Sequence, residues 1–114
     1  MKELIQKLRN FAKEREWEQF HSPKNLAMAL SVEVAEIVEI FQWLTQEESK
    51  NLRPDVLQKV KEEIGDVKIF LTNLADKLGI DLLAAAMEKI EVNERKYPVD
   101  KAKGSAKKYT EFEK

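Results

Sequence analysis

Apolar residues recur at helical intervals along most of this chain, without the strict alternation that is typical of strands. Only three glycines and three prolines interrupt these segments in 114 residues. The pattern predicts an all-α fold built like a four-helix bundle. We expect the helices near residues 2–18, from Pro23 to about Trp43, from about Asp55 to Leu78, and from 82 to about Lys96.

Local signals set the ends of these segments. Ser22 is expected to cap the second helix, Gly79 to end the third in a left-handed conformation, and Asp81 to cap the fourth. Residues 44–54 are polar and are predicted to form a loop with at most one short helical turn. The polar tail, residues 97–114, shows no periodicity, so a disordered end and an arm laid over the body both remain open.

The second helix is apolar on nearly every side, which predicts a central position, packed by neighbouring helices or by another subunit. Since 43% of the residues are hydrophobic, four helices of one short chain cannot cover every such face. We therefore predict a single domain, residues 1–114, that forms a homo-oligomer.

The net charge of the chain limits the classes of binding partner that it could attract. The net charge is −1, so no global field attracts a nucleic acid polymer or an anionic membrane. No stretch has the length of a membrane span or a signal peptide, and there is no cysteine. These observations predict a soluble, cytoplasmic protein.

The segment "SVEVAEIVEIFQW" carries Glu33, Glu36 and Glu39 in an apolar setting. Neither Glu33 nor Glu36 has a basic residue three or four positions away, so no helical ion pair offsets their repulsion. A solvated acidic face is the simplest alternative, but it would leave the flanking apolar side chains in water. The acidic residues therefore point to a bound cation.

The pattern is repeated on the next long helix, where "EIGDVKIFL" echoes "EVAEIVEIF". If the two helices pack antiparallel, Glu33 and Glu36 can face Glu63 and Asp66. Oxygen ligands alone favour Mg²⁺ over softer metals, and a di-iron bundle would need a histidine three residues after a Glu. The nearby Lys59, Lys61 and Glu62 are interpreted as part of a solvated face.

The motifs "EVAE" and "EIGD" resemble the paired signatures of the MazG-like all-α nucleoside triphosphate pyrophosphohydrolases. The segments "REWEQFHSPKNLAMALSVEVAEIVEIFQW", "EEIGDV", "NERKYP" and "KKYTE" are similar, in order and spacing, to the dCTP pyrophosphatase branch. The resemblance covers nearly the whole chain. It implies a MazG-type fold and a tetramer built as a dimer of dimers.

The resemblance implies that Glu33, Glu36, Glu63 and Asp66 hold Mg²⁺ and that a deoxynucleoside triphosphate is cleaved to the monophosphate and pyrophosphate. Glu36 is our candidate to position or deprotonate the attacking water, and Glu39 is expected to brace a ligand or a helix. The favoured substrate is dCTP or a modified relative. Two alternatives stay open: the same chemistry on dUTP or another non-standard nucleotide, and a non-catalytic helical assembly module.

The resemblance also implies the residues that bind substrate. Those around the base and sugar are Trp17, His21, Asn25, Trp43 and Phe70. The polar edge expected to meet the phosphates consists of Lys89, Asn93 and Lys96 or Tyr97. The tail residues Lys108 and Tyr109 match a further block of the family. Leu8 and Phe70 stand where vertebrate members of the branch carry His and Tyr, which makes cytosine preference less secure than the reaction.

Overall fold

The computed structural model describes residues 1–106, and every regular element among them is helical. The prediction of an all-α chain is confirmed. The tail residues Lys108 and Tyr109 lie outside the described residues. The elements are α1 (Lys2–Glu14), a 3₁₀ helix (Glu18–Phe20), α2 (Pro23–Phe41), α3 (Gln46–Ser49), α4 (Pro54–Lys77), α5 (Leu82–Lys96) and α6 (Val99–Ala102).

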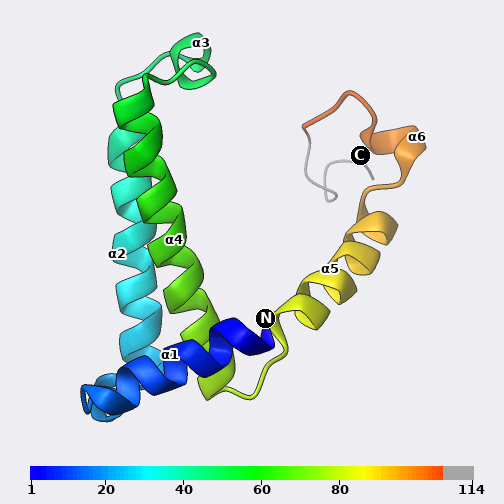
Figure 1. The fold of residues 1–114 in the computed structure, drawn as a ribbon. Helices are drawn as coiled ribbons and strands as arrows, with labels where there is room; N and C mark the ends of the chain where they lie inside the picture. The colour runs from blue at the N-terminus through cyan, green and yellow to red at the C-terminus, as the bar shows by residue number, and fades with distance from the viewer. Residues whose placement is uncertain (107–114) are drawn as a thin grey trace. The chain divides into compact units, whose positions relative to one another are not determined.

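The contacts of the chain divide it into two compact units, Met1–Ile80 and the remainder from Asp81, which are described separately. In the first unit α2 and α4 run antiparallel and pack along their length, as Figure 1 shows. Short α3 lies in the connection at one end of this hairpin, and α1 packs against α4 at the other end. The antiparallel pairing expected from the repeated acidic motif is therefore present.

The hairpin begins where the sequence predicted. The Ser22 hydroxyl accepts a hydrogen bond from the backbone N–H of Asn25, and Pro23 occupies the first turn of α2. The connection contains a short helix because Thr45 and Glu48 form a capping box, each side chain accepting from the backbone N–H of the other. That signal was present in the sequence, in the segment predicted to hold at most one helical turn.

The first helix is shorter than the predicted range of residues 2–18. It ends at Glu14, and Glu16 adopts a positive φ of 55°. A left-handed residue reverses the path of the chain and is costly for a side chain with a Cβ. The chain then forms the 3₁₀ helix Glu18–Phe20, so Trp17 lies in a turn instead of on a helical face.

Few side chains of this unit are buried. The apolar ones are Ala12, Leu26, Val60 and Ala75, together with the polar Thr72. An ion pair adds to the packing of α1 on α4, because the Arg9 guanidinium donates to both carboxylate oxygens of Asp76 at 2.9 and 2.6 Å. This bidentate geometry fixes the position of α1 at the C-terminal end of α4.

The helix that was predicted to be central is covered on one side only within its own unit. Leu26 is buried, but Met28, Val32 and Val38 on α2 each expose more than half of their surface. On α4, Leu57 and Ile64 are also more than half exposed. The hairpin therefore presents a broad apolar surface that its own unit does not cover.

The second unit begins at the predicted cap. The Asp81 carboxylate accepts a hydrogen bond from the backbone N–H of Ala84, and Gly79 just before it has the left-handed φ of 67°. Helix α5 ends at Lys96, as expected, and α6 follows in the segment that the sequence left without regular structure. Among the described residues, no helix is long and apolar enough to cross a membrane.

Candidate active site

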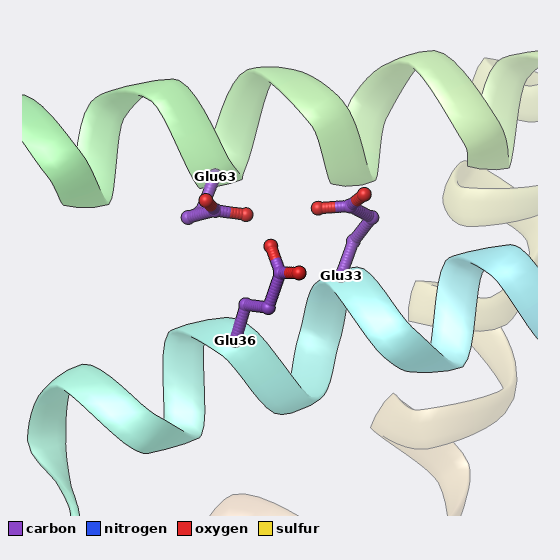
Figure 2. Close-up of side chains that lie close together, drawn as sticks. All are labelled: Glu33, Glu36 and Glu63. Carbon is purple, nitrogen blue, oxygen red and sulfur yellow. The ribbon is translucent and has the colours of Figure 1, made fainter.

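Three of the four predicted acidic residues converge between the two long helices. Figure 2 shows Glu33 and Glu36 on α2 and Glu63 on α4, with their carboxylates directed toward one another. One oxygen from each residue lies within 4.8 Å of the others. Their convergence follows from the antiparallel pairing, which places the acidic motif of one helix opposite the motif of the other.

Two oxygen atoms of these carboxylates are shielded from solvent. The Oε2 atoms of Glu33 and Glu63 are buried, and neither has a hydrogen-bond partner among the described residues. Hydrogen bonding with Glu36, and then with Glu33, raises the pKa of Glu63 to about 7. Burial raises the pKa of Glu33, to which the nearby carboxylates of Glu36 and Asp66 add. Such a cluster is stabilised by a proton or by a cation.

Asp66 stands slightly apart from this group. It is partly buried, one turn beyond Glu63 on α4, and its charge is close enough to raise the pKa of Glu33. It is not among the three residues whose oxygens meet within 4.8 Å. Its predicted role as a fourth ligand stays a prediction.

An open cavity of about 540 Å³ adjoins the cluster, lined by Glu36, Glu39, Ile40, Lys59, Glu62 and Glu63. Glu39, expected to brace a ligand, therefore opens onto the same space as Glu36. Lys59 is the one cation in this lining, and among the described residues it forms no ion pair. Lys59 is exposed, which agrees with its interpretation as part of a solvated face, and its position four residues before Glu63 places it on the same side of α4.

A second cavity, of about 150 Å³, lies where α1 and the following turn meet α4. It brings together three predicted base-binding residues, Trp17, His21 and Phe70. The Trp17 ring meets the Phe11 ring edge to face, with centroids 5.6 Å apart, and the Arg15 guanidinium lies 3.7 Å from the Phe11 centroid. These contacts hold the indole in the cavity wall.

The full lining of this aromatic cavity consists of Leu8, Phe11, Ala12, Trp17, His21, Ile69, Phe70 and Asn73. Sequence reasoning missed Asn73. The only sequence signal for it is its spacing of three residues from Phe70, which places both on one side of α4.

Two other predicted base-binding residues are not part of this lining. The Asn25 side chain donates a hydrogen bond to the carbonyl of Phe20, which ties the 3₁₀ helix to α2. Trp43 follows the C-terminal end of α2 and exposes 87% of its surface. Because His21 precedes the same helix, the rise of α2 separates Trp43 from His21 by about 30 Å. Within one chain, Trp43 cannot close the aromatic cavity.

The predicted phosphate-binding residues belong to the second unit. Lys89, Asn93 and Lys96 are spaced by four and three residues on α5, so they share one side of that helix, and Tyr97 follows as its C-terminal cap. Their role stays a prediction.

The family is established by comparison. A model of the MazG-like family matches residues 28–112, a span that contains all four predicted metal ligands. The chain belongs to the MazG-like family, as its sequence motifs indicated.

Comparison with individual proteins identifies relatives of this chain within the family. Human dCTP pyrophosphatase 1 is 45% identical over 104 residues, which are 90% of this chain and 61% of the human protein. The mouse protein of the same name is 43% identical over the same length. The chain thus spans about three fifths of these relatives. A crystal structure of a pyrophosphatase from Archaeoglobus fulgidus matches with a TM-score of 0.76 and 45% identity, covering 86% of this chain and 92% of that one.

Proposed function

We propose that this protein is a Mg²⁺-dependent pyrophosphohydrolase that cleaves deoxynucleoside triphosphates to the monophosphate and pyrophosphate, with dCTP or a modified dCTP favoured. It would remove such nucleotides from the cellular pool, which implies action in the cytoplasm. Support comes from family membership, from relatives named dCTP pyrophosphatase 1, and from the acidic site.

The observation that carries the proposal is the pair of buried carboxylate oxygens, on Glu33 and Glu63, that no described residue satisfies. Leaving charged oxygens buried without a partner is costly. Oxygen ligands on two helices fit a hard divalent cation, and we propose Glu33, Glu36, Glu63 and Asp66 as the residues that hold Mg²⁺. When bound, Mg²⁺ would neutralise charge on the phosphate oxygens.

The residues of the chain would then direct one displacement. A water oxygen forms a bond to the α phosphorus, and the bond from that phosphorus to the bridging oxygen breaks, so that pyrophosphate leaves with the electron pair. We assign the removal of the water proton to Glu36, because it belongs to the acidic cluster and also lines the open cavity.

The aromatic cavity is proposed to hold the base, with Trp17 and Phe70 providing flat walls and His21 a polar group. We propose that Lys89, Asn93, Lys96 and Tyr97 contact the phosphates. Asn25 is proposed to shape the base site by fixing the turn before α2.

We propose that residues 1–114 form one domain that assembles as a tetramer, a dimer of dimers. The exposed apolar side chains of α2 and α4 support an assembly that covers them. If Trp43 lines a base site, a second copy of the chain must supply it, because it lies about 30 Å from His21 in its own chain.

Mixing two variants, each impaired in a different part of the proposed site, tests this arrangement. Trp43→Ala and Glu36→Gln chains, unfolded and refolded together, should form mixed assemblies in which some sites have both an intact Glu36 and an intact Trp43 from the neighbour. Activity recovered above that of either variant refolded alone supports the shared site. No recovery, despite mixed assemblies detected by native mass spectrometry, would exclude it.

The decisive experiment for the activity is a panel of deoxynucleoside triphosphates with Mg²⁺, assayed for pyrophosphate. Glu36→Gln should lose activity, while Glu3→Gln, an exposed acid on α1, should not. A preference for dUTP or another non-standard nucleotide would keep the chemistry and change the substrate. Equal, metal-independent background from the wild type and Glu36→Gln would leave only the alternative of a non-catalytic assembly module.

A further inference from the structure

The aromatic cavity contains an amide that the family resemblance does not explain. Asn73 lies on α4, half-buried, in the same lining as Trp17, His21 and Phe70. Among residues 1–106 its side chain has no hydrogen-bond partner. It therefore presents one unused donor group and one unused acceptor to a small hollow that is otherwise mostly apolar.

A packing role accounts poorly for this residue. Asn is among the weaker helix formers, and Asn73 is a helical residue of α4, four positions before its last residue, Lys77. Its neighbours Leu8 and Ala12 on α1 would be better matched by an apolar side chain, although Asn73 also borders a smaller cavity that Arg9 and Asp76 line. Asp76, one turn later, differs from Asn73, because its carboxylate accepts two hydrogen bonds from Arg9. Asn73 has no such partner.

We propose that Asn73 reads the Watson–Crick edge of a pyrimidine base held in the aromatic cavity, and thereby sets the base preference of the hydrolase. This inference rests on the proposed function. The amide offers N–H and C=O side by side, which matches the ring nitrogen and exocyclic amine of cytosine. Leu8 and Phe70 offer no such groups, so Asn73 supplies the polar contact that these positions lack.

The placement of Asn73 along α4 suits this role. Glu63, Asp66, Phe70 and Asn73 follow one another at intervals of three, four and three residues, so they lie on one side of the helix. The order along that side is carboxylates, aromatic ring, amide. A nucleotide bound with its phosphates at the carboxylates would therefore direct its base toward Phe70 and Asn73.

The test compares dCTP with the triphosphate of deoxyribosyl-2-pyrimidinone, which lacks the exocyclic amine. The wild type should prefer dCTP in kcat/KM by about tenfold, the size expected of one good amide–base contact. Asn73→Ala should lose most of this preference, because its kcat/KM should fall further for dCTP, which loses two contacts, than for the analogue, which loses one. Asn51→Ala, an exposed amide on the connection between α3 and α4, is the matched control and should keep the preference.

Asn73→Ala is expected to fold, because Ala is a better helix former than Asn. Asn73→Leu provides a second variant that fills the space. An unchanged preference in both variants overturns the proposal, as does an effect confined to purine substrates. If the wild type releases no pyrophosphate from any triphosphate, the proposed function fails separately. Calorimetric titration with deoxycytidine monophosphate then decides, since binding that Asn73→Ala does not weaken would still overturn the role of Asn73.

Discussion

The acidic cluster and the aromatic cavity both lie along α4, but they affect the stability of the fold in opposite directions. Repulsion within the cluster lowers the stability, and the packing of the cavity walls raises it. In the cluster, Glu33, Glu36 and Glu63 are held together against their own repulsion, with raised pKa values for Glu33 and Glu63. In the cavity, Trp17, Phe11 and Phe70 form ordinary apolar and ring contacts. On the proposed function, the first site is strained until a cation binds, whereas the second is already part of the packing.

Because of this difference, substitutions at the two sites should affect activity and stability in different ways. Removing a charge from the cluster should abolish activity and also relieve repulsion, so the variant becomes more stable while losing its function. Removing a ring from the cavity should weaken both substrate binding and the packing of α1. The two sites therefore make opposite predictions for stability, which experiments on purified protein can separate.

The largest expected effect is at the cluster. Glu63→Gln should lower kcat/KM by about 10²-fold or more, because one carboxylate is lost from the site that we propose to bind the cation. Without metal at pH 8, the same variant should unfold at a higher temperature than the wild type. Kinetics and thermal unfolding followed by circular dichroism measure both, and a variant less stable than the wild type would contradict the idea of a strained cluster.

The second-largest effect is expected at the aromatic cavity. Trp17→Ala should raise KM by roughly tenfold with a smaller change in kcat, since a flat wall of the proposed base site is removed while the carboxylates stay in place. It should also lower stability, because the ring contact with Phe11 is lost. A large fall in kcat at unchanged KM would instead show that Trp17 acts in the chemical step.

The sequence predicted the cluster better than the cavity, for a physical reason. Glu33, Glu36 and Glu63 lie in two short local motifs, and pairing two adjacent helices antiparallel is enough to bring them together. The 3₁₀ helix and the positive φ of Glu16 depend on how the chain turns after α1, which helical periodicity does not encode. Asn73 joins the cavity only because the Arg9–Asp76 ion pair and long-range packing place α1 against α4.

The pH dependence of stability offers a smaller effect that separates the two sites. An acid with a higher pKa in the folded protein binds protons more tightly when folded, so its contribution to stability falls as pH rises. For Glu63 the window runs from its ordinary pKa of 4.5 to about 7. In EDTA, the unfolding temperature of the wild type should fall relative to Glu63→Gln across this window. Mg²⁺ should then raise the unfolding temperature of the wild type more at pH 8 than at pH 5. The unfolding temperature of Trp17→Ala should depend on pH and on Mg²⁺ as that of the wild type does.

The smallest expected effect concerns Lys59, which lines the open cavity beside Glu36 and Glu63 and has no ion-pair partner among the described residues. Lys59→Ala should raise KM for the triphosphate a few-fold, on the order of 1 kcal/mol, because an exposed charge is well screened. Lys61→Ala is the matched control, since Lys61 is equally exposed but does not line the cavity.

Two roles of Lys59 make different predictions. If its charge attracts the outer phosphates, Lys59→Ala should also weaken inhibition by added pyrophosphate, and Lys59→Arg should restore both values. If the lysine only offsets the carboxylates, its removal should instead strengthen Mg²⁺ binding and leave pyrophosphate inhibition unchanged. The first result would extend the acidic cluster into a site that attracts both cation and anion, whereas the lining of the aromatic cavity is mostly apolar.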